Sequence, residues 1–193
     1  MNALAISLGW AAGMAANERN PAEVDRFASD LIELSTRDNF VFWLAIGTVW
    51  RGWARSASGN TAEGIPYIEQ GIKDYRTTGA VLTLPLFLGL KAEALYLAGR
   101  TSEALEATNE AKALTERFEI RDWCAELLRL RGMFLVETGA DETDIEASFC
   151  AAIRIAREQK SLSLTKRAEA TYAEYRRQKA SESGERRFRL PLC

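Results

Sequence analysis

Nine stretches rich in apolar residues run along this chain, and short polar or glycine-containing turns separate them. Alanine, leucine, glutamate and arginine are abundant, which favours helix, and only four prolines occur. Asn20 followed by Pro21 and Glu23 is typical of a helix start, and Gly59 is typical of a helix end. We therefore predict nine helices, at about residues 2–16, 21–36, 40–57, 61–77, 83–98, 101–117, 121–138, 143–159 and 162–178.

The predicted helices repeat with a fixed period. Gly59, Gly99 and Gly139 lie 40 positions apart, and an extra residue after Gly139 lengthens the next period to 41. A second set of small residues, seven positions earlier, has the same spacing: Gly52, Ala92 and Gly132. Self-similarity at this period is typical of stacked helical hairpins rather than of a domain with a single core. We predict an all-α solenoid of about four helical hairpins followed by a C-terminal capping helix.

Tryptophans follow the same repeat. Trp10 and Trp50 are 40 positions apart, and Trp43 and Trp123 are 80 positions apart. Bulky residues at equivalent positions of a solenoid pack between neighbouring repeats. We therefore expect these four side chains to be buried between hairpins.

Composition indicates a folded chain with a basic end. The 193 residues carry a net charge of −2, yet residues 160–193 hold nine lysines and arginines against four acidic residues. We predict a single repeat domain over 1–179 and a basic tail over 180–193. General nucleic acid binding relies on excess positive charge, so the net charge of −2 predicts that nucleic acid is not a partner.

Several kinds of chemistry lack their usual residues in this sequence. No histidine occurs, which removes the commonest general base and transition-metal ligand. We therefore predict no catalytic residues, no metal site and no cofactor. Three cysteines without paired spacing indicate reduced thiols and a cytoplasmic protein: Cys124, Cys150 and Cys193. No stretch is apolar enough to be a signal peptide or a membrane span, so we expect no membrane partner.

The repeat resembles the tetratricopeptide repeat family over about residues 1–178. The two sets of small residues match the family's small position in the first helix and its turn glycine. The stretch Leu97–Ala111 is the clearest match, and its Ala104 corresponds to the alanine after the turn. At the large position of the second helix stand Ile68 and Phe149, but Thr108 interrupts this pattern in the middle repeat. The resemblance implies a right-handed superhelix with a concave groove.

The period distinguishes this chain from the usual family member, whose repeat has about 34 residues. It is similar to the long-repeat variants at the C-terminal ends of maltose-regulator-type transcription activators and ATPase-linked adenylate cyclases. In those proteins the cyclase and ATPase chemistry lies in upstream domains. This sequence has no glycine-rich phosphate loop of the GxxxxGK[ST] type. The resemblance therefore implies a module without enzymatic activity.

Two surfaces are candidate interaction sites. In the resembled family one face of the first helices lines the groove, and a rigid aromatic residue there suits peptide capture. The residues on this face are Ile46, Val49, Trp53, Glu93, Glu126, Arg129 and Met133. The first predicted helix is apolar up to Glu18, although a terminal repeat should present a polar outer face. We predict association through Leu4, Ile6 and Leu8, either as a homodimer or with upstream sequence of a longer protein.

The function predicted from the sequence is a non-catalytic scaffold for protein–protein interaction. It binds a protein or peptide in bacterial signalling or transcriptional regulation. The alternative is a repeat domain that senses a small molecule, which requires an enclosed pocket with a few convergent polar groups.

Overall fold

The computed structural model describes residues 3–182, and within this range the chain forms nine α-helices and no strand. The all-α repeat fold is therefore confirmed, and eight of the nine predicted helices begin and end within three residues of their observed bounds. The helices are α1 (Ala3–Asn17), α2 (Pro21–Arg37), α3 (Val41–Ala57), α4 (Thr61–Thr77), α5 (Leu84–Leu97), α6 (Thr101–Arg117), α7 (Cys124–Glu137), α8 (Glu142–Glu158) and α9 (Leu162–Glu182).

The turns between helices share one backbone geometry. Each turn from a first helix to its second helix contains a residue with positive φ, and these residues are Arg19, Gly59, Gly99 and Gly139. The turns between hairpins do the same at Asn39, Gly79, Glu119 and Lys160. Left-handed backbone ends an α-helix while its last carbonyls keep hydrogen-bond partners. The period of the sequence is thus the period of these turns.

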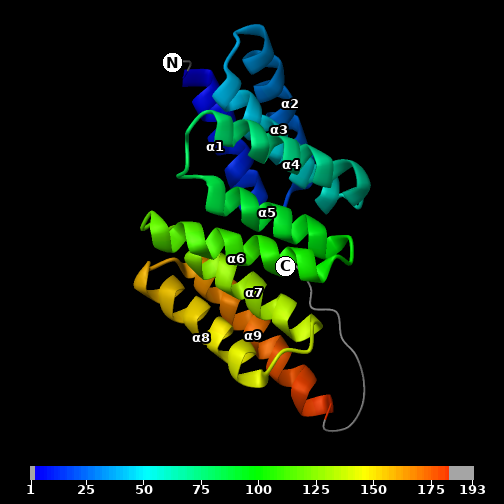
Figure 1. The fold of residues 1–193 in the computed structure, drawn as a ribbon, viewed down its shortest axis with the longest axis vertical. Coiled ribbons are helices and arrows are strands. Elements are labelled where there is room, and N and C mark those ends of the chain that lie inside the picture. The colour runs from blue at the N-terminus through cyan, green and yellow to red at the C-terminus, as the bar shows by residue number, and fades with distance from the viewer. Residues whose placement is uncertain (1–2, 183–193) are drawn as a thin grey trace. The chain divides into compact units, whose positions relative to one another are not determined.

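The helices divide into two compact units, which we describe separately. The first unit comprises Met1–Ala107 and holds α1 to α5 with the start of α6. The second unit comprises Thr108–Cys193 and holds the rest of α6 with α7 to α9 (Figure 1). The predicted single domain over 1–179 stays a prediction. Helix α9 extends through the start of the predicted tail, and the remainder of that tail lies outside the described residues.

Glycine allows the closest helix contact in the first unit, between α3 and α4. A Cβ atom at Gly64 would lie 2.1 Å from Ser56 Oγ and 2.4 Å from the carbonyl oxygen of Gly52. Only a residue without a side chain lets the two backbones approach this closely. An aromatic cluster then joins α4 to its neighbours, because Tyr75 lies between Phe42 of α3 and Phe87 of α5.

The second unit has its own core. Gly132 of α7 makes room for Phe149 of α8, whose ring atoms would lie 2.7 Å from a Cβ at that position. Phe149 also contacts the rings of Tyr172 and Tyr175, which attach α9 to α8. Over the described part of the chain, no helix combines the length and the apolarity needed to cross a membrane.

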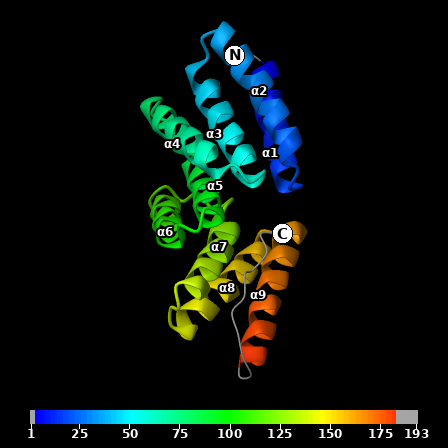
Figure 2. The ribbon, with the colours of Figure 1, turned by 90° about the vertical axis from the view of Figure 1, so that its right-hand side faces the viewer.

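The expected burial of tryptophan holds at Trp50 and fails at Trp10, while Trp43 and Trp123 are half-buried. Trp50 of α3 is 5% exposed and packs on α1, where a Cβ at Gly13 would lie 3.5 Å from its ring. Trp10 occupies the equivalent place in α1 and is 71% exposed. In the first unit α1 and α2 lie together at the edge, with α3 beside them (Figure 2). No described helix lies before α1 to cover Trp10, so the prediction for this residue is wrong.

Candidate functional site: a cleft and two buried polar clusters

The predicted groove residues of the first unit form a buried cluster instead of an open surface. Ile46, Val49 and Trp53 are buried in α3, and Glu93 is buried in α5. The indole N–H of Trp53 donates a hydrogen bond of 3.0 Å to Glu93 Oε2. Arg19, from the turn after α1, donates to the other oxygen of the same carboxylate and forms an ion pair with it. Glu93 of α5 thus connects α3 to the turn that follows α1.

The groove residues of the second unit form a similar cluster between α7 and α9. The guanidinium of Arg129 is fully buried and donates two hydrogen bonds, of 3.0 and 2.7 Å, to the carboxylate of Glu126. It also donates to Met133 Sδ and to the hydroxyl of Thr171 in α9. Arg167 of α9 forms a second ion pair with Glu126 at 3.4 Å. A buried guanidinium is tolerated only with such partners.

These contacts change what the seven residues do. Trp53 is 2% exposed and its only polar atom is engaged, so it is not an exposed anchor for a peptide. The two clusters join first helices by hydrogen bonds and ion pairs: α3 to α5 in the first unit, and α7 to α9 in the second. Binding of a partner through these residues is not tested by the structure and stays a prediction.

The residues predicted for self-association differ in exposure. Leu4 is exposed on α1, whereas Ile6 and Leu8 are half-buried. The bulky side chains most exposed on this helix are Trp10 and Met14. Association through Leu4, Ile6 and Leu8 stays a prediction, and the exposed apolar face lies mainly at other residues.

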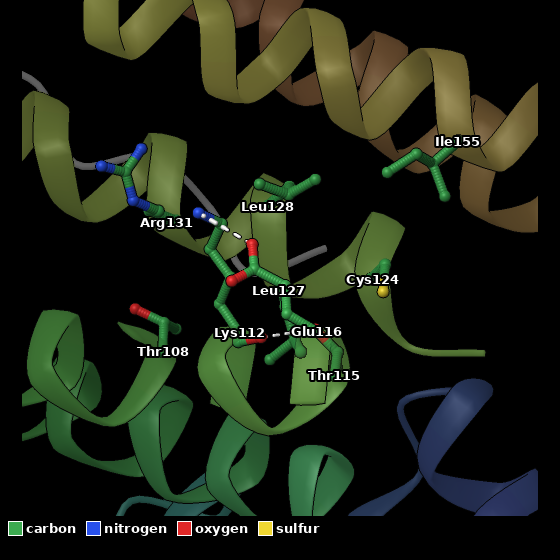
Figure 3. Close-up of a pocket in the computed structure, with 9 residues that line it drawn as sticks. All are labelled: Thr108, Lys112, Thr115, Glu116, Cys124, Leu127, Leu128, Arg131 and Ile155. Atoms are coloured by element: carbon green, nitrogen blue, oxygen red, sulfur yellow. Dashed lines mark hydrogen bonds and ion pairs between the residues drawn. The ribbon is translucent and has the colours of Figure 1, made fainter. Parts of the chain in front are cut away.

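The second unit contains an open-sided cleft that the sequence did not predict. It has a volume of about 210 Å³ and lies between the C-terminal half of α6, the start of α7 and α8 (Figure 3). Leu127, Leu128 and Ile155 provide apolar walls, and Cys124 lies beside them. Buried Thr108 and Thr115 complete the lining from α6. The cleft has the size of one apolar side chain or a small molecule.

Two small residues of α6 account for the cleft. Thr115 is the repeat equivalent of Tyr75, which fills the corresponding place in the first unit and lies 5.0 Å, ring to ring, from Phe87. The equivalent of Phe87 is Leu127, so both aromatic rings are replaced by smaller side chains here. Thr108 similarly stands where the neighbouring repeats have large residues. Its departure from the family pattern was the one sign of this cleft in the sequence.

Charged residues surround the apolar lining. Lys112 and Glu116 form an ion pair of 3.2 Å at the solvent edge, and Arg131 reaches Ser148 of α8 with a hydrogen bond. A larger depression of about 580 Å³ shares Thr115, Glu116, Cys124 and Ile155 with the cleft. Its further lining is mostly polar or charged: Glu119, Ile120, Arg121, Arg154, Glu158 and Gln159. An apolar seat beside charges of both signs suits a peptide whose apolar side chain is flanked by polar groups.

The described residues offer little for metal chemistry. Among them, no three histidine, cysteine or acidic side chains come together in a group that could hold a metal ion.

Comparison with known proteins places the fold and leaves the family open. No family model matches the chain. An uncharacterized protein of Rhizobium meliloti (strain 1021) is 33% identical over 120 residues. That match covers 62% of this chain but only 12% of the relative, so the chain spans a small part of that relative's length.

A solved structure shares the fold. The crystal structure of Bacillus thuringiensis PlcR, in complex with the peptide PapR7 and DNA, matches with a TM-score of 0.66 and 16% identity. The match covers 86% of this chain and 73% of PlcR, a helical regulator with tetratricopeptide-like repeats. At this identity the likeness shows the fold, which supports the resemblance inferred from the repeat.

The PlcR complex corrects one prediction. We excluded a nucleic acid partner because of the net charge of −2. A protein of the same fold was crystallised with DNA as well as with a peptide, so the exclusion is wrong. Net charge averages over a whole chain and does not show how charge is distributed over one surface.

Proposed function

We propose that this chain is a non-catalytic helical-repeat module of a cytoplasmic regulator, and that it binds a peptide segment of a partner protein in the cleft of the second unit. One observation carries the proposal: Thr108 and Thr115 leave an apolar seat where the equivalent positions of the first unit are filled. The surrounding charges supply polar contacts for a peptide backbone and its flanking side chains.

The fold supports this assignment. PlcR combines a tetratricopeptide-like fold with a bound peptide, and its complex also contains DNA. A regulatory role linked to DNA is compatible with the proposal. The proposal invokes no catalytic group: apolar and hydroxyl side chains line the cleft together with the thiol of Cys124, the ion pair of Lys112 and Glu116, and Arg131.

A second candidate is a small-molecule sensor. The apolar part of the cleft holds only about 210 Å³, which suits a compact ligand as well as one side chain. A small ligand would use the apolar cleft by itself. A peptide would extend into the neighbouring charged depression.

The test is to fill the cleft without disturbing the fold. Thr115→Tyr with Thr108→Ile restores the bulk that the equivalent residues have in the first unit. Wild-type and filled full-length chains are panned against a phage-displayed library of random heptapeptides, and the enriched peptides are titrated by fluorescence anisotropy. We expect wild type to enrich peptides that share an apolar residue and the filled variant to lose at least tenfold in affinity, about 1.4 kcal/mol.

Thr77→Tyr is the matched control. Thr77 is an exposed threonine near the end of α4 whose hydroxyl donates to Asp74 O at 2.7 Å, as Thr115 does to Lys112 O at 2.7 Å. Equal affinity of wild type and the filled variant would show that peptides do not use the cleft. Failure to enrich any peptide, together with thermal stabilisation of wild type but not of the filled variant by a small-molecule library, would favour the sensor.

A further inference from the structure

Helix α1 carries an exposed apolar face in the first unit. Trp10 is 71% exposed and Met14, one turn later, is 65% exposed, and Leu4 of the same helix is 55% exposed. The opposite side is built from small buried residues, including Ala5, Gly9 and Ala12, that pack against α2 and α3. A soluble terminal repeat normally presents a polar outer face, so this surface requires an explanation.

The repeat shows what normally covers this face. The equivalents of Trp10 and Met14 in α3 are Trp50 and Ala54, and both are buried. The equivalents in α5 and in α9 are likewise buried: Leu90, Ala94, Thr171 and Tyr175. In the first unit α3 packs on α1 and α2, and α5 packs on α3 and α4. The face exposed on α1 is therefore the face that a preceding hairpin covers on the later first helices.

The contact between α3 and α1 shows the form of the missing partner. The ring of Trp43 lies against Gly9, where a Cβ would be 2.9 Å from Cζ3, and the ring of Trp50 lies over Gly13. Two small residues four positions apart on α1 thus form the seat for the tryptophans of α3. To be buried in the same way, Trp10 would pack against small residues on a first helix that precedes α1.

Among the described residues, the two glycines that form such a packing site are already occupied. In each copy, Gly9 and Gly13 already receive Trp43 and Trp50. A second copy paired through the same face would place Trp10 and Met14 against each other without a seat. The Rhizobium meliloti relative extends far beyond the matched segment, because the match covers 12% of its length.

We propose that the exposed face of α1 docks a helical hairpin of the same repeat type, supplied by a segment outside these 193 residues, whose first helix presents small residues four positions apart. The docked hairpin continues the packing already seen between α1, α2 and α3. Trp10 is the central contact of this interface. The surface lies in the first unit and is independent of the cleft proposed above.

The experiment supplies such a hairpin to the full chain. A copy of residues 1–40 is joined directly in front of Met1, which keeps the 40-residue register, and Trp10 of the added copy is changed to Gln. Exposure of the original Trp10 is measured by 19F NMR of 5-fluorotryptophan-labelled protein with acrylamide or a soluble paramagnetic quencher, and a Trp10→Phe variant assigns its signal. Hydrogen exchange of α1 is measured in parallel.

We expect the quencher effect on Trp10 to fall and the protection of α1 amides to rise about tenfold or more in the extended chain. The matched control carries Gly9→Gln and Gly13→Gln in the added copy only, where these positions face the next first helix. It should behave as the unextended chain does.

Two results would overturn the proposal. One is an equal exposure of Trp10 in the extended and unextended chains while the added residues are helical by circular dichroism. The other is a dimer of the unextended chain in light scattering that becomes a monomer on Trp10→Gln, since a second copy would then be the partner of this face.

Discussion

Glu93 provides the sharpest test of how the first unit is held together. Its carboxylate is buried between α3 and α5 and accepts hydrogen bonds from the indole of Trp53 and the guanidinium of Arg19. The side chain of Glu93 is 7% exposed and that of Arg19 is 23% exposed. The change Glu93→Gln keeps an acceptor for the indole but removes the negative charge that Arg19 needs.

The size of the effect follows from these contacts. A hydrogen bond to a charged group contributes about 1.5–3 kcal/mol to stability. Because Arg19 is partly exposed, we expect Glu93→Gln to lower the free energy of unfolding by about 2 kcal/mol. The change Glu93→Ala also leaves the buried N–H of Trp53 without an acceptor and opens a cavity. Breaking a buried pair in this way costs about 3–5 kcal/mol. The free energy of unfolding should therefore decrease in the order wild type, Glu93→Gln, Glu93→Ala.

Urea unfolding at pH 7, followed by tryptophan fluorescence, measures this order. Four of the five tryptophans lie in the first unit, and Trp123→Phe removes the signal of the second unit. Glu106→Gln, at an exposed position of α6, is the control and should change the free energy of unfolding by less than about 0.5 kcal/mol. A Glu93→Gln variant as stable as this control would refute the structural role of the cluster.

Three further changes test the packing, the turns and the surface charges. Gly64→Ala should lower the free energy of unfolding by about 3 kcal/mol or more in urea, because its Cβ would overlap the α3 backbone at 2.4 Å. Lys160→Gly should raise the thermal midpoint, with a gain of about 0.5–1 kcal/mol, because Lys160 has a φ of 55° that glycine adopts without strain. The hydrogen bond from Arg100, followed by its charge, lowers the pKa of Glu103. The stability that this pair adds is present above the unfolded pKa of about 4.3 and is lost as pH falls through the lower folded pKa, so Glu103→Gln should flatten the acid side of a plot of thermal midpoint against pH.

The sequence was most informative about local structure. Glycine at 59, 99 and 139 marks turns whose φ is positive, and the structure confirms them. Asn20 accepts a hydrogen bond from the backbone N–H three residues later, as its helix-start signal predicts, and Asn60 does the same one period later. These features depend on a few neighbouring residues and on backbone sterics, which a single sequence displays directly.

The sequence was less informative about exposure. The position of Trp10 in the repeat was identified correctly, yet its burial depends on a neighbouring hairpin that the described residues do not include. The cleft presents the same difficulty in reverse. Thr115 looks like an ordinary helical threonine until Tyr75 is recognised as the side chain that fills its equivalent place. A cavity or an exposed apolar face forms where no neighbouring side chain or helix fills the space beside a residue. The residue pattern of a single sequence indicates such a missing neighbour only weakly.

Residues one period apart occupy equivalent positions of the repeat, and some of them are also in direct contact. Trp53 and Glu93 are 40 positions apart and share a hydrogen bond, while Glu126 and Arg167 are 41 positions apart, after the extra residue, and share an ion pair. Within the first unit α3 and α5 therefore touch at this equivalent position, and within the second unit α7 and α9 touch at another. A tryptophan followed one period later by a glutamate is then a donor followed by an acceptor, and a glutamate followed by an arginine is an ion pair. The pattern at Trp53 therefore indicates a buried contact with the next first helix of the same unit rather than an open groove. It pairs Trp53 with Glu93, and this pairing explains why the polar side chain of Glu93 is buried.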